Sequence, residues 1–378
     1  MRYPAFLPEG GRIGYIAPSF GAADEWYGAK FDAALKAFED RGYTSVLGPN
    51  CRLDNGIGKS NTPEQCAAEI NDFFINDRSD VILSVGGGET MCEDLTHVDF
   101  DAIAKAEPKW FMGYSDNTNL TFTLPVLCDT AAIYGPCATA FGQREWHASL
   151  SDALRILQGQ ADAEDMTGMA RSVSARPDSE GQTFTLHNYP AWEGGKVSAE
   201  EITEETAEEP DPCAPWELTE PSCFTAYAPG STEPTAEKVE FSGRLLGGCI
   251  DCLQTLCGTR FDRVREFAEK YKEEGILWFL EACDLNPMSM RRVLWQLKEA
   301  GWFQNAKGFI IGRPLHFREE MMGMNRTNAV LGALSDLNVP ILLDTDLGHL
   351  PPAIPYISGA VARVTAEAGR MTVSQILR

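Results

Sequence analysis

Hydrophobic and polar residues alternate regularly along the first 160 positions of the chain. Apolar runs of strand length occupy residues 11–19, 44–50, 80–88, 109–114 and 131–136. Between the first two runs, residues 24–41 carry apolar side chains at helical spacing, among them Phe31 and Phe38. Thr62 and Pro63 have the order of a helix start, with a Thr cap before Pro at the first helical position. Strands that alternate with helices predict a parallel sheet covered on both faces.

A second regular region begins near residue 241. Its apolar runs are residues 243–259, 275–282, 307–314 and 339–360. A helix is predicted to open at Asn286 and Pro287, because apolar residues recur on one face after them. We therefore expect an α/β protein with an N-terminal α/β domain at 1–165 and a smaller C-terminal α/β domain at 241–378.

The segment between these domains, residues 166–240, differs in composition. From Ser198 to Pro221 it has nine Asp or Glu and no Lys or Arg. Such a stretch suits a solvated linker with an acidic insertion. A lid over an active site is the alternative, because long loops often carry function.

Composition and charge narrow the class of protein. The chain has 378 residues, of which 44% are hydrophobic, and this is typical of a globular protein of about two domains. It has no apolar run long enough to cross a membrane, and its N-terminus does not have the pattern of a signal peptide. The eleven scattered Cys suit reduced thiols, so we expect a cytoplasmic protein. The net charge of −23 argues against binding to nucleic acid or to anionic membranes.

The strand predicted at 109–114 stops on Gly-Tyr-Ser-Asp, which places Ser115 at a strand-turn-helix junction. A serine there exposes its hydroxyl beside a helix N-terminus and could be a nucleophile. It could equally cap the helix. Because ligands bind at the carboxyl ends of parallel strands, and residues 86–89 and Ser19 lie at such ends too, the nucleophile interpretation gains support.

A serine nucleophile needs a base and a group that orients the base. The histidines available are His97, His147, His187, His316 and His349. His349 follows a predicted strand in a loop rich in Gly and Pro, where a rigid imidazole could act as the base. The alternative is a surface histidine without a catalytic role. Glu281 ends a strongly apolar strand, and a lone buried carboxylate is costly. Its partner could be a histidine or an arginine; the arginines considered are Arg291, Arg292 and Arg313.

Two other chemistries are less well supported. The glycine turn at 86–88 does not follow the known phosphate-binding patterns, although its backbone N–H groups could serve an oxyanion or a phosphate. Cys249, Cys252, Cys257 and Cys283 do not form the two CxxC pairs of a zinc site, so buried thiols are the expected state. We expect neither a metal nor a cofactor.

Seven stretches taken together resemble one family. They are IAPSFG, GGGETMCEDL, PKWFMGYSDNT, GRLLGGCIDCLQTLCGT, ILWFLEACDLNPMSMRRVLWQLKEAGWF, KGFIIGRP and DLGHLPPAIPYISGA, in this order. The chain is similar in these stretches to the serine LD-carboxypeptidases and to their relatives, the microcin C immunity peptidases. The GGGET turn looks more like the microcin-immunity branch than like the murein-recycling carboxypeptidases.

The resemblance implies a catalytic triad of Ser115 as nucleophile, His349 as general base and Glu281 as the orienting acceptor. The active site would lie between the two domains, and the protein would be a cytoplasmic homodimer. The expected function is that of a serine carboxypeptidase or amidase that works through an acyl-enzyme. Its substrate would be a murein L,D-tetrapeptide or a peptidyl or aminoacyl nucleotide. A non-catalytic protein that binds a small ligand on the same fold is the alternative.

The resemblance also implies an oxyanion hole made by the backbone N–H of Asp116 and that of Gly88 or Gly87. Glu89 and Cys249 are candidate substrate contacts. Cys249 stands where the family commonly has Asn after two glycines, so substrate recognition is expected to differ there.

Overall fold

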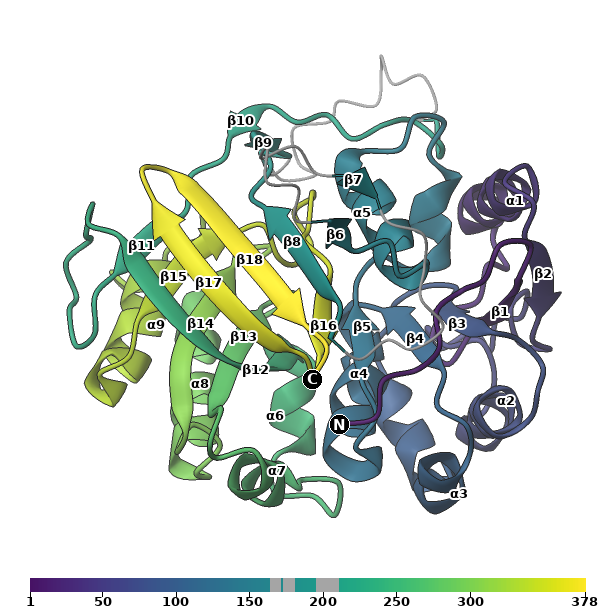
Figure 1. Cartoon of the computed structure of the whole chain (residues 1–378), viewed down its shortest axis with the longest axis horizontal. Helices are drawn as coiled ribbons and strands as arrows, with labels where there is room; N and C mark the ends of the chain where they lie inside the picture. Colours follow the sequence, from purple (N-terminus) through teal and green to yellow (C-terminus); the bar gives the residue numbers. More distant parts are fainter. Residues whose placement is uncertain (164–170, 173–180, 195–210) are drawn as a thin grey trace.

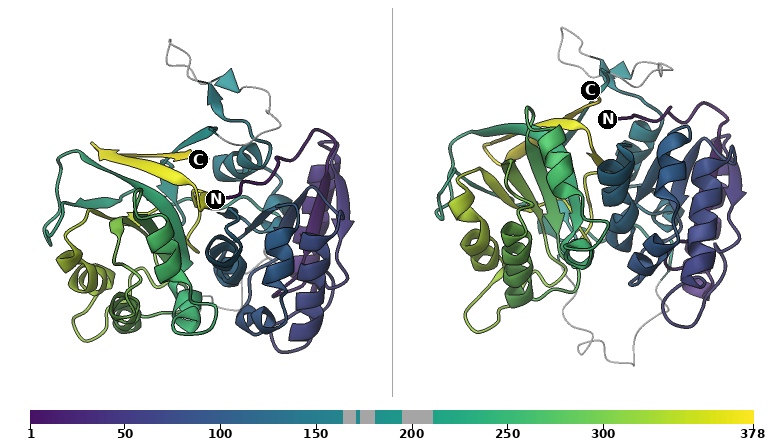
Figure 2. Two further views of the ribbon diagram at one scale, coloured as in Figure 1. Left: turned by 60° about the horizontal axis from the view of Figure 1, so that its bottom comes forward. Right: turned by 90° about the horizontal axis from the view of Figure 1, so that it is seen from below.

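Two sheets placed side by side form the framework of the protein. The computed structural model describes residues 1–163, 171–172, 181–194 and 211–378. In Figure 1 the first sheet, with β1 to β5 in purple to blue, and the second sheet, with its central strands in green, lie next to each other, and both termini lie near their junction. The two views of Figure 2 show helices packed along the outer sides of both sheets. No helix among the described residues has the length and apolar character needed to cross a membrane.

The first sheet has six strands in the order β16-β5-β4-β3-β1-β2. The five strands from the N-terminal half run parallel, and β16 joins β5 antiparallel. Their bounds are β1 Arg12–Ile16, β2 Thr44–Leu47, β3 Val81–Ser84, β4 Trp110–Gly113, β5 Ala132–Tyr134 and β16 Tyr356–Ser358. The parallel sheet predicted from the alternating pattern is therefore confirmed. The chain order reverses between β1 and β3, which is where ligands bind in open sheets of this kind.

Five α-helices accompany these strands in the described part of the first half. They are α1 Glu25–Glu39, α2 Pro63–Ile75, α3 Phe100–Lys105, α4 Thr118–Cys128 and α5 Ala148–Leu157. Asp24 caps α1 and Thr62 caps α2, each by accepting a backbone N–H three residues on. Phe31 and Phe38 of α1 are fully buried, in agreement with the helical spacing of the sequence.

The second sheet has eight strands in the order β11-β15-β14-β13-β12-β17-β18-β8. The four central strands, β12 to β15, run parallel, and the four outer strands pair antiparallel. Their bounds are β8 Thr183–His187, β11 Thr225–Tyr227, β12 Val239–Cys249, β13 Ile276–Glu281, β14 Ala306–Gly312, β15 Ile341–Thr345, β17 Val361–Glu367 and β18 Arg370–Ile376. Its helices are α6 Ile250–Leu256, α7 Val264–Lys270, α8 Pro287–Glu299 and α9 Arg326–Leu334.

The sheets exchange strands across the predicted domain boundaries. β16 comes from the C-terminal region but completes the first sheet, while β8 and β11 come from residues 166–240 and extend the second. Described parts of the predicted linker are thus built into a sheet. Two further sheets in the described residues have two short strands each. In one, β6 Asp162–Ala163 pairs with β7 Arg171–Ser172, and in the other, β9 Ala191–Trp192 pairs with β10 Glu220–Pro221. Most of the acidic insertion, up to residue 210, lies outside the described residues.

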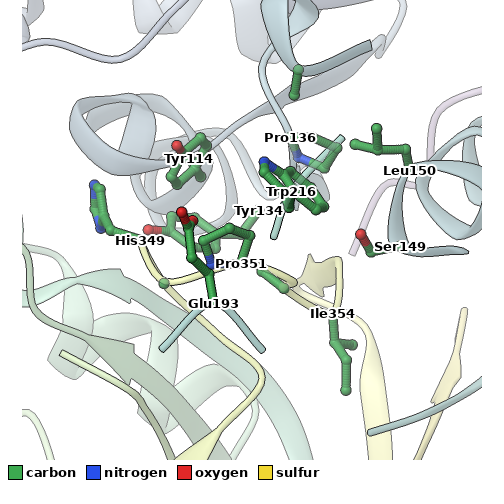
Figure 3. Close-up of a pocket in the computed structure, with 14 residues that line it drawn as sticks. Tyr114, Tyr134, Pro136, Ser149, Leu150, Glu193, Trp216, His349, Pro351 and Ile354 are labelled. Atoms are coloured by element: carbon green, nitrogen blue, oxygen red, sulfur yellow. The ribbon is translucent and has the colours of Figure 1, made fainter. Parts of the chain in front are cut away.

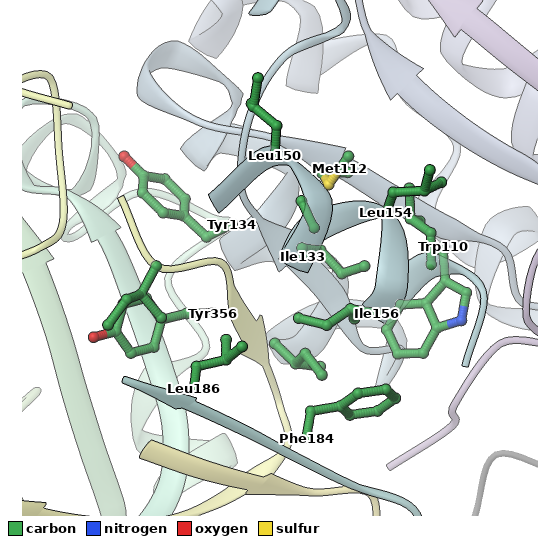
Figure 4. Packing of buried hydrophobic residues seen from close by; sticks show 14 of the residues in the cluster. Trp110, Met112, Ile133, Tyr134, Leu150, Leu154, Ile156, Phe184, Leu186 and Tyr356 are labelled. Carbon is green, nitrogen blue, oxygen red and sulfur yellow. The ribbon is translucent and has the colours of Figure 1, made fainter. Parts of the chain in front are cut away.

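One hydrophobic core runs through the contact between the sheets. Phe184 and Leu186 of β8 pack in a buried cluster with Ile133 of β5 and Ile156 of α5 (Figure 4). The cluster also includes Phe279 of β13, whose ring stacks on Tyr356 of β16 at 5.1 Å between centroids. Because buried apolar area is the main source of stability, this shared core fixes the two sheets relative to each other.

Candidate active site

β4 ends at Gly113, and after Tyr114 the chain forms a short 3-10 turn, Ser115–Asn117, that leads into α4. The backbone of Ser115 has a φ of +62°, in the left-handed region that residues other than Gly rarely adopt. Ser115 does not cap the helix: Asn117 occupies the N-cap position of α4. The tight turn instead holds the Ser115 hydroxyl toward the second sheet.

The Ser115 hydroxyl meets His349, and His349 meets Glu281. Ser115 Oγ lies 2.8 Å from His349 Nε2, and His349 Nδ1 lies 2.9 Å from Glu281 Oε2. The three side chains, predicted from three strand ends, are therefore in hydrogen-bonding contact across the two sheets. Arg313, one of the alternative partners for Glu281, forms a buried ion pair with Asp346 at 2.7 Å instead.

Local backbone geometry lets the His349 loop approach Glu281 closely. Glu281 is the last residue of β13 and is 1% exposed. Gly348, with a φ of +109°, lies beside it, and a Cβ atom at position 348 would be 2.9 Å from Glu281 Oε2. A side chain there would collide with the carboxylate. Glycine is therefore required at position 348 both for its positive φ and for the close approach to Glu281.

The charges of His349 and Glu281 stabilise each other. Burial alone would raise the pKa of Glu281, but the positive charge of His349 and hydrogen bonds to the carboxylate hold that pKa below its ordinary value. Burial alone would lower the pKa of His349, but the Glu281 carboxylate raises it well above its ordinary value. The pair is poised to bind a proton at His349 while Glu281 stays ionised.

Tyr134 is part of the same arrangement, and the sequence interpretation missed it. Its hydroxyl donates a hydrogen bond to Glu281 Oε1 at 2.6 Å and accepts one from the backbone N–H of Ser115 at 3.1 Å. Tyr134 ends β5, the strand next to β4. The only signal in the sequence is a hydroxyl-bearing residue at the carboxyl end of a buried strand.

The glycine turn after β3 packs against the turn that carries Ser115. A Cβ atom at Gly87 would lie 3.3 Å from Ser115 Oγ, and one at Gly88 would lie 1.9 Å from Ser19 Oγ. Ser19 Oγ donates to the buried Asp116 carboxylate at 2.6 Å, and Met91 N–H donates to it at 2.9 Å. The Asp116 side chain thus ties the turns together, and the backbone of Asp116, Gly87 and Gly88, the predicted oxyanion-hole residues, borders Ser115.

Two pockets flank the Ser115–His349 contact. The histidine-side pocket has a volume of about 210 Å³. Its lining is largely aromatic and aliphatic, and includes Tyr114, Pro136, Leu150, Trp216, His349 and Ile354. Figure 3 shows His349 at one end of this pocket, with Leu150 and Ser149 at the other. Trp216 comes from the described part of the acidic insertion, so this segment contributes to the site.

The serine-side pocket is smaller, at about 90 Å³, and its lining is polar. Its lining residues include Ser115, the candidate contacts Glu89 and Cys249, three further acidic residues (Asp116, Asp251 and Asp284) and three further thiols (Cys92, Cys252 and Cys283). Burial raises the pKa of Glu89, and the negative charge of Asp284 raises it further. The pocket therefore has a negative potential that disfavours anionic groups.

The other candidate chemistry of the sequence involves the thiols. All eleven cysteines are free. Cys249, Cys252 and Cys283 meet at the serine-side pocket, where Cys249 and Cys252 lie at the start of α6. Within the described part of the chain, no group of His, Cys, Asp and Glu side chains is arranged to hold a metal ion.

Comparisons with known proteins cover nearly the whole chain. Residues 13–135 match the family model of the LD-carboxypeptidase N-terminal domain, and residues 242–364 match that of the LD-carboxypeptidase C-terminal domain. A relative from Bacillus subtilis, described as a probable murein peptide carboxypeptidase, is 25% identical over 373 residues, covering 96% of this chain and 92% of the relative.

Solved structures with the same fold include two kinds of protein. An MccF-like protein from Bacillus anthracis superposes with a TM-score of 0.74 at 17% identity, with 100% of both chains covered. The microcin C7 self-immunity protein MccF, in complex with aspartyl sulfamoyl adenosine, has a TM-score of 0.74 at 20% identity, covering 100% of this chain and 99% of that one. A muramoyltetrapeptide carboxypeptidase from Oxalobacter formigenes has a TM-score of 0.65 at 17% identity, covering 96% and 98%. These structures share the two-domain α/β architecture seen here.

Proposed function

Because this chain belongs to the LD-carboxypeptidase family, we propose that it is a serine hydrolase that cleaves a small peptide-like substrate through an acyl-enzyme. The observation that carries the proposal is the continuous hydrogen-bonded contact from Ser115 through His349 to Glu281. Peptidase activity follows from the family, and the geometry of the site suggests the role of each residue.

In the first step Ser115 Oγ attacks the carbonyl carbon of the scissile bond. His349 Nε2 takes the hydroxyl proton as the new C–O bond forms, and Glu281 stabilises the resulting imidazolium through Nδ1–H. Backbone N–H groups of Asp116 and of Gly87 or Gly88 stabilise the oxyanion of the tetrahedral intermediate.

Collapse of the intermediate breaks the bond to the leaving group. His349 returns its proton to the leaving nitrogen, so the leaving group must lie on the side of the imidazole. Water then attacks the acyl carbon while His349 takes a proton from it. As the bond between the acyl carbon and Ser115 Oγ breaks, His349 gives this proton to Ser115 Oγ, and the acid product and the free enzyme are released.

This proton path assigns a role to each pocket. The leaving group occupies the histidine-side pocket, where Trp216 and Tyr114 offer an aromatic, apolar surface. The acyl group occupies the serine-side pocket beside Glu89, Asp251 and Asp284. Both candidate substrates, a murein L,D-tetrapeptide and an aminoacyl or peptidyl nucleotide, supply a carbonyl between two such groups.

Two kinds of relative support these substrates. The Bacillus subtilis relative carries the name of a murein peptide carboxypeptidase, and structures of MccF hold aspartyl sulfamoyl adenosine and glutamyl sulfamoyl guanosine. A murein tetrapeptide substrate would correspond to a role in peptidoglycan recycling, and an aminoacyl or peptidyl nucleotide substrate to a role in microcin immunity. The expected homodimer and cytoplasmic location remain predictions, which gel filtration and cell fractionation test.

Labelling with a fluorophosphonate separates an enzyme from the alternative, a non-catalytic binding protein. A hydrolase is expected to react once per chain at Ser115, and Ser115→Ala is expected to remain unlabelled. A folded wild-type protein that does not react would support the binding protein. Incubation with murein tetrapeptides and with aminoacyl sulfamoyl adenosines, followed by mass spectrometry of the products, then identifies the substrate.

A further inference from the structure

The hydrogen bonds around Ser115 close into a ring. Starting at the Ser115 hydroxyl, the ring passes through His349 and Glu281 to the Tyr134 hydroxyl, and it returns to the backbone N–H of Ser115. It joins β4, β5, β13 and the loop after β15, and therefore both sheets. The ring begins and ends on the same residue, so the position of each member restrains that of the next.

The fold alone does not require a hydrogen-bonded hydroxyl at position 134. Tyr356 is the direct cross-strand partner of Tyr134, and it is fully buried in the same core. Its hydroxyl has no hydrogen-bond partner among the described residues. The sheet thus accommodates a buried tyrosine whose oxygen is unsatisfied, whereas the oxygen of Tyr134 makes two hydrogen bonds to the site.

The protonation state of Tyr134 suits a donor. Burial and the nearby negative charge of Glu281 raise the pKa of Tyr134 well above its ordinary value, so the hydroxyl keeps its proton. That proton points to Glu281 Oε1, which leaves Oε2 for His349. The oxygen of Tyr134 remains free to accept the N–H of Ser115.

We propose that Tyr134 is a positioning residue for the reaction, acting through both Glu281 and Ser115. Its donation fixes the rotamer of the Glu281 carboxylate and withdraws part of its negative charge. The Tyr134 oxygen accepts a hydrogen bond from the Ser115 N–H, so this N–H is not available to the oxyanion. The oxyanion is then stabilised by the N–H groups of Asp116 and of the glycine turn. The inference rests on the proposed function, because it concerns how the same three side chains are held.

The electrostatic part of the proposal has a definite sign. A donor to Glu281 Oε1 lowers the proton affinity of the His349–Glu281 pair. Removing the donor leaves more negative charge facing His349, which then holds its proton more tightly. Since His349 must be neutral to act as a base, the acid limb of the pH profile moves to higher pH when the donor is lost.

The test compares Tyr134→Phe with Tyr356→Phe, two changes that each remove one buried oxygen from paired strands. The readout is the second-order rate of fluorophosphonate labelling at Ser115 as a function of pH, which does not depend on knowing the substrate. For Tyr134→Phe we expect labelling to be slower by roughly 10- to 100-fold and the acid limb to move up by about one pH unit, as expected for loss of a hydrogen bond to a charged group. Tyr356→Phe should keep the wild-type rate and profile.

A second variant tests the same point without removing the hydroxyl. Difluorotyrosine introduced at position 134 is a stronger donor, so the acid limb should move to lower pH than in the wild type. Unchanged limbs in both Tyr134 variants, or equal effects in Tyr356→Phe, overturn the inference while leaving the proposed function intact. A wild-type protein that is not labelled at all overturns both.

Discussion

The left-handed backbone of Ser115 predicts an unusual result for two inactive variants. Ser115→Ala and Ser115→Gly both remove the hydroxyl and its contact with His349 at 2.8 Å. They differ in backbone preference, because Ala keeps a Cβ atom at a φ of +62° and Gly does not. We expect Ser115→Gly to be the more stable of the two, against the usual rule that glycine destabilises.

The size of the difference follows from two opposing effects. A left-handed conformation costs a residue with a Cβ atom about 1–2 kcal/mol, which glycine avoids. Glycine gains more conformational entropy than alanine in the unfolded chain, which offsets about 0.4–1 kcal/mol of this. The free energy of unfolding of Ser115→Gly should therefore exceed that of Ser115→Ala by about 1 kcal/mol.

Chemical denaturation is the suitable assay. At about 2.1 cal/mol/K for each residue, unfolding of a chain of 378 residues has so large an entropy that 1 kcal/mol moves Tm by only about 1 °C. In urea, with a slope of about 3 kcal/mol/M, the same difference moves the midpoint by about 0.3 M. Urea titrations followed by tryptophan fluorescence resolve such a shift.

Met322 supplies a matched control. It also has a left-handed backbone, with a φ of +53°, but its side chain is 91% exposed and lines neither pocket of the candidate site. Met322→Gly should exceed Met322→Ala in stability by a similar amount. If the Met322 pair shows the difference and the Ser115 pair does not, Ser115 is not strained and the argument from its φ is wrong.

Four further outcomes are expected. His349→Ala should fold and lose roughly 10³-fold or more in turnover, as should Ser115→Ala, because members of a triad act as a unit; near-normal turnover in either would contradict the mechanism. Because Glu281 raises the pKa of His349, the labelling rate of the wild type should rise with pH along an acid limb whose midpoint lies above pH 6.5. In Glu281→Gln the midpoint of this limb should lie at lower pH, and an unchanged midpoint would count against the pairing of His349 with Glu281. Gly88→Ala should slow labelling, since its Cβ atom would lie 1.9 Å from Ser19 Oγ and the turn must shift; a wild-type rate would show that the turn is not part of the oxyanion site. Labelling should survive EDTA and phenanthroline, and a loss that zinc restores would refute a mechanism without metal.

The regular part of the fold was predictable because local pattern decides it. The helix α1 was foreseen from its apolar face, α2 from its Thr cap followed by Pro, and β1 to β5 from short apolar runs. β8 and β16 were not foreseen as members of their sheets. They are 5 and 3 residues long, and their pairing is decided by partners far away in the sequence rather than by any periodicity of their own.

The site shows the same division. Ser115, His349 and Glu281 could be named because each follows or ends a strand, and because the motifs around them resemble those of a family. Tyr134 could not, because a tyrosine in an apolar strand is normally a core residue, and its acceptor Glu281 lies 147 positions away. Polar contacts between distant segments leave little trace in a single sequence.

The strand exchange between the sheets has a consequence for how this protein can be divided. A fragment that ended at residue 165 would lack β16, and its β5 edge would present unpaired backbone groups to solvent. A fragment that began at residue 241 would lack β8 and β11, which flank its sheet on both outer sides. Each fragment would expose a sheet edge whose backbone groups are unpaired, and such edges promote aggregation. We therefore expect the two fragments to be soluble only when they are produced together. The two regions are expected to fold together as one unit, although the sequence pattern alone predicts two domains.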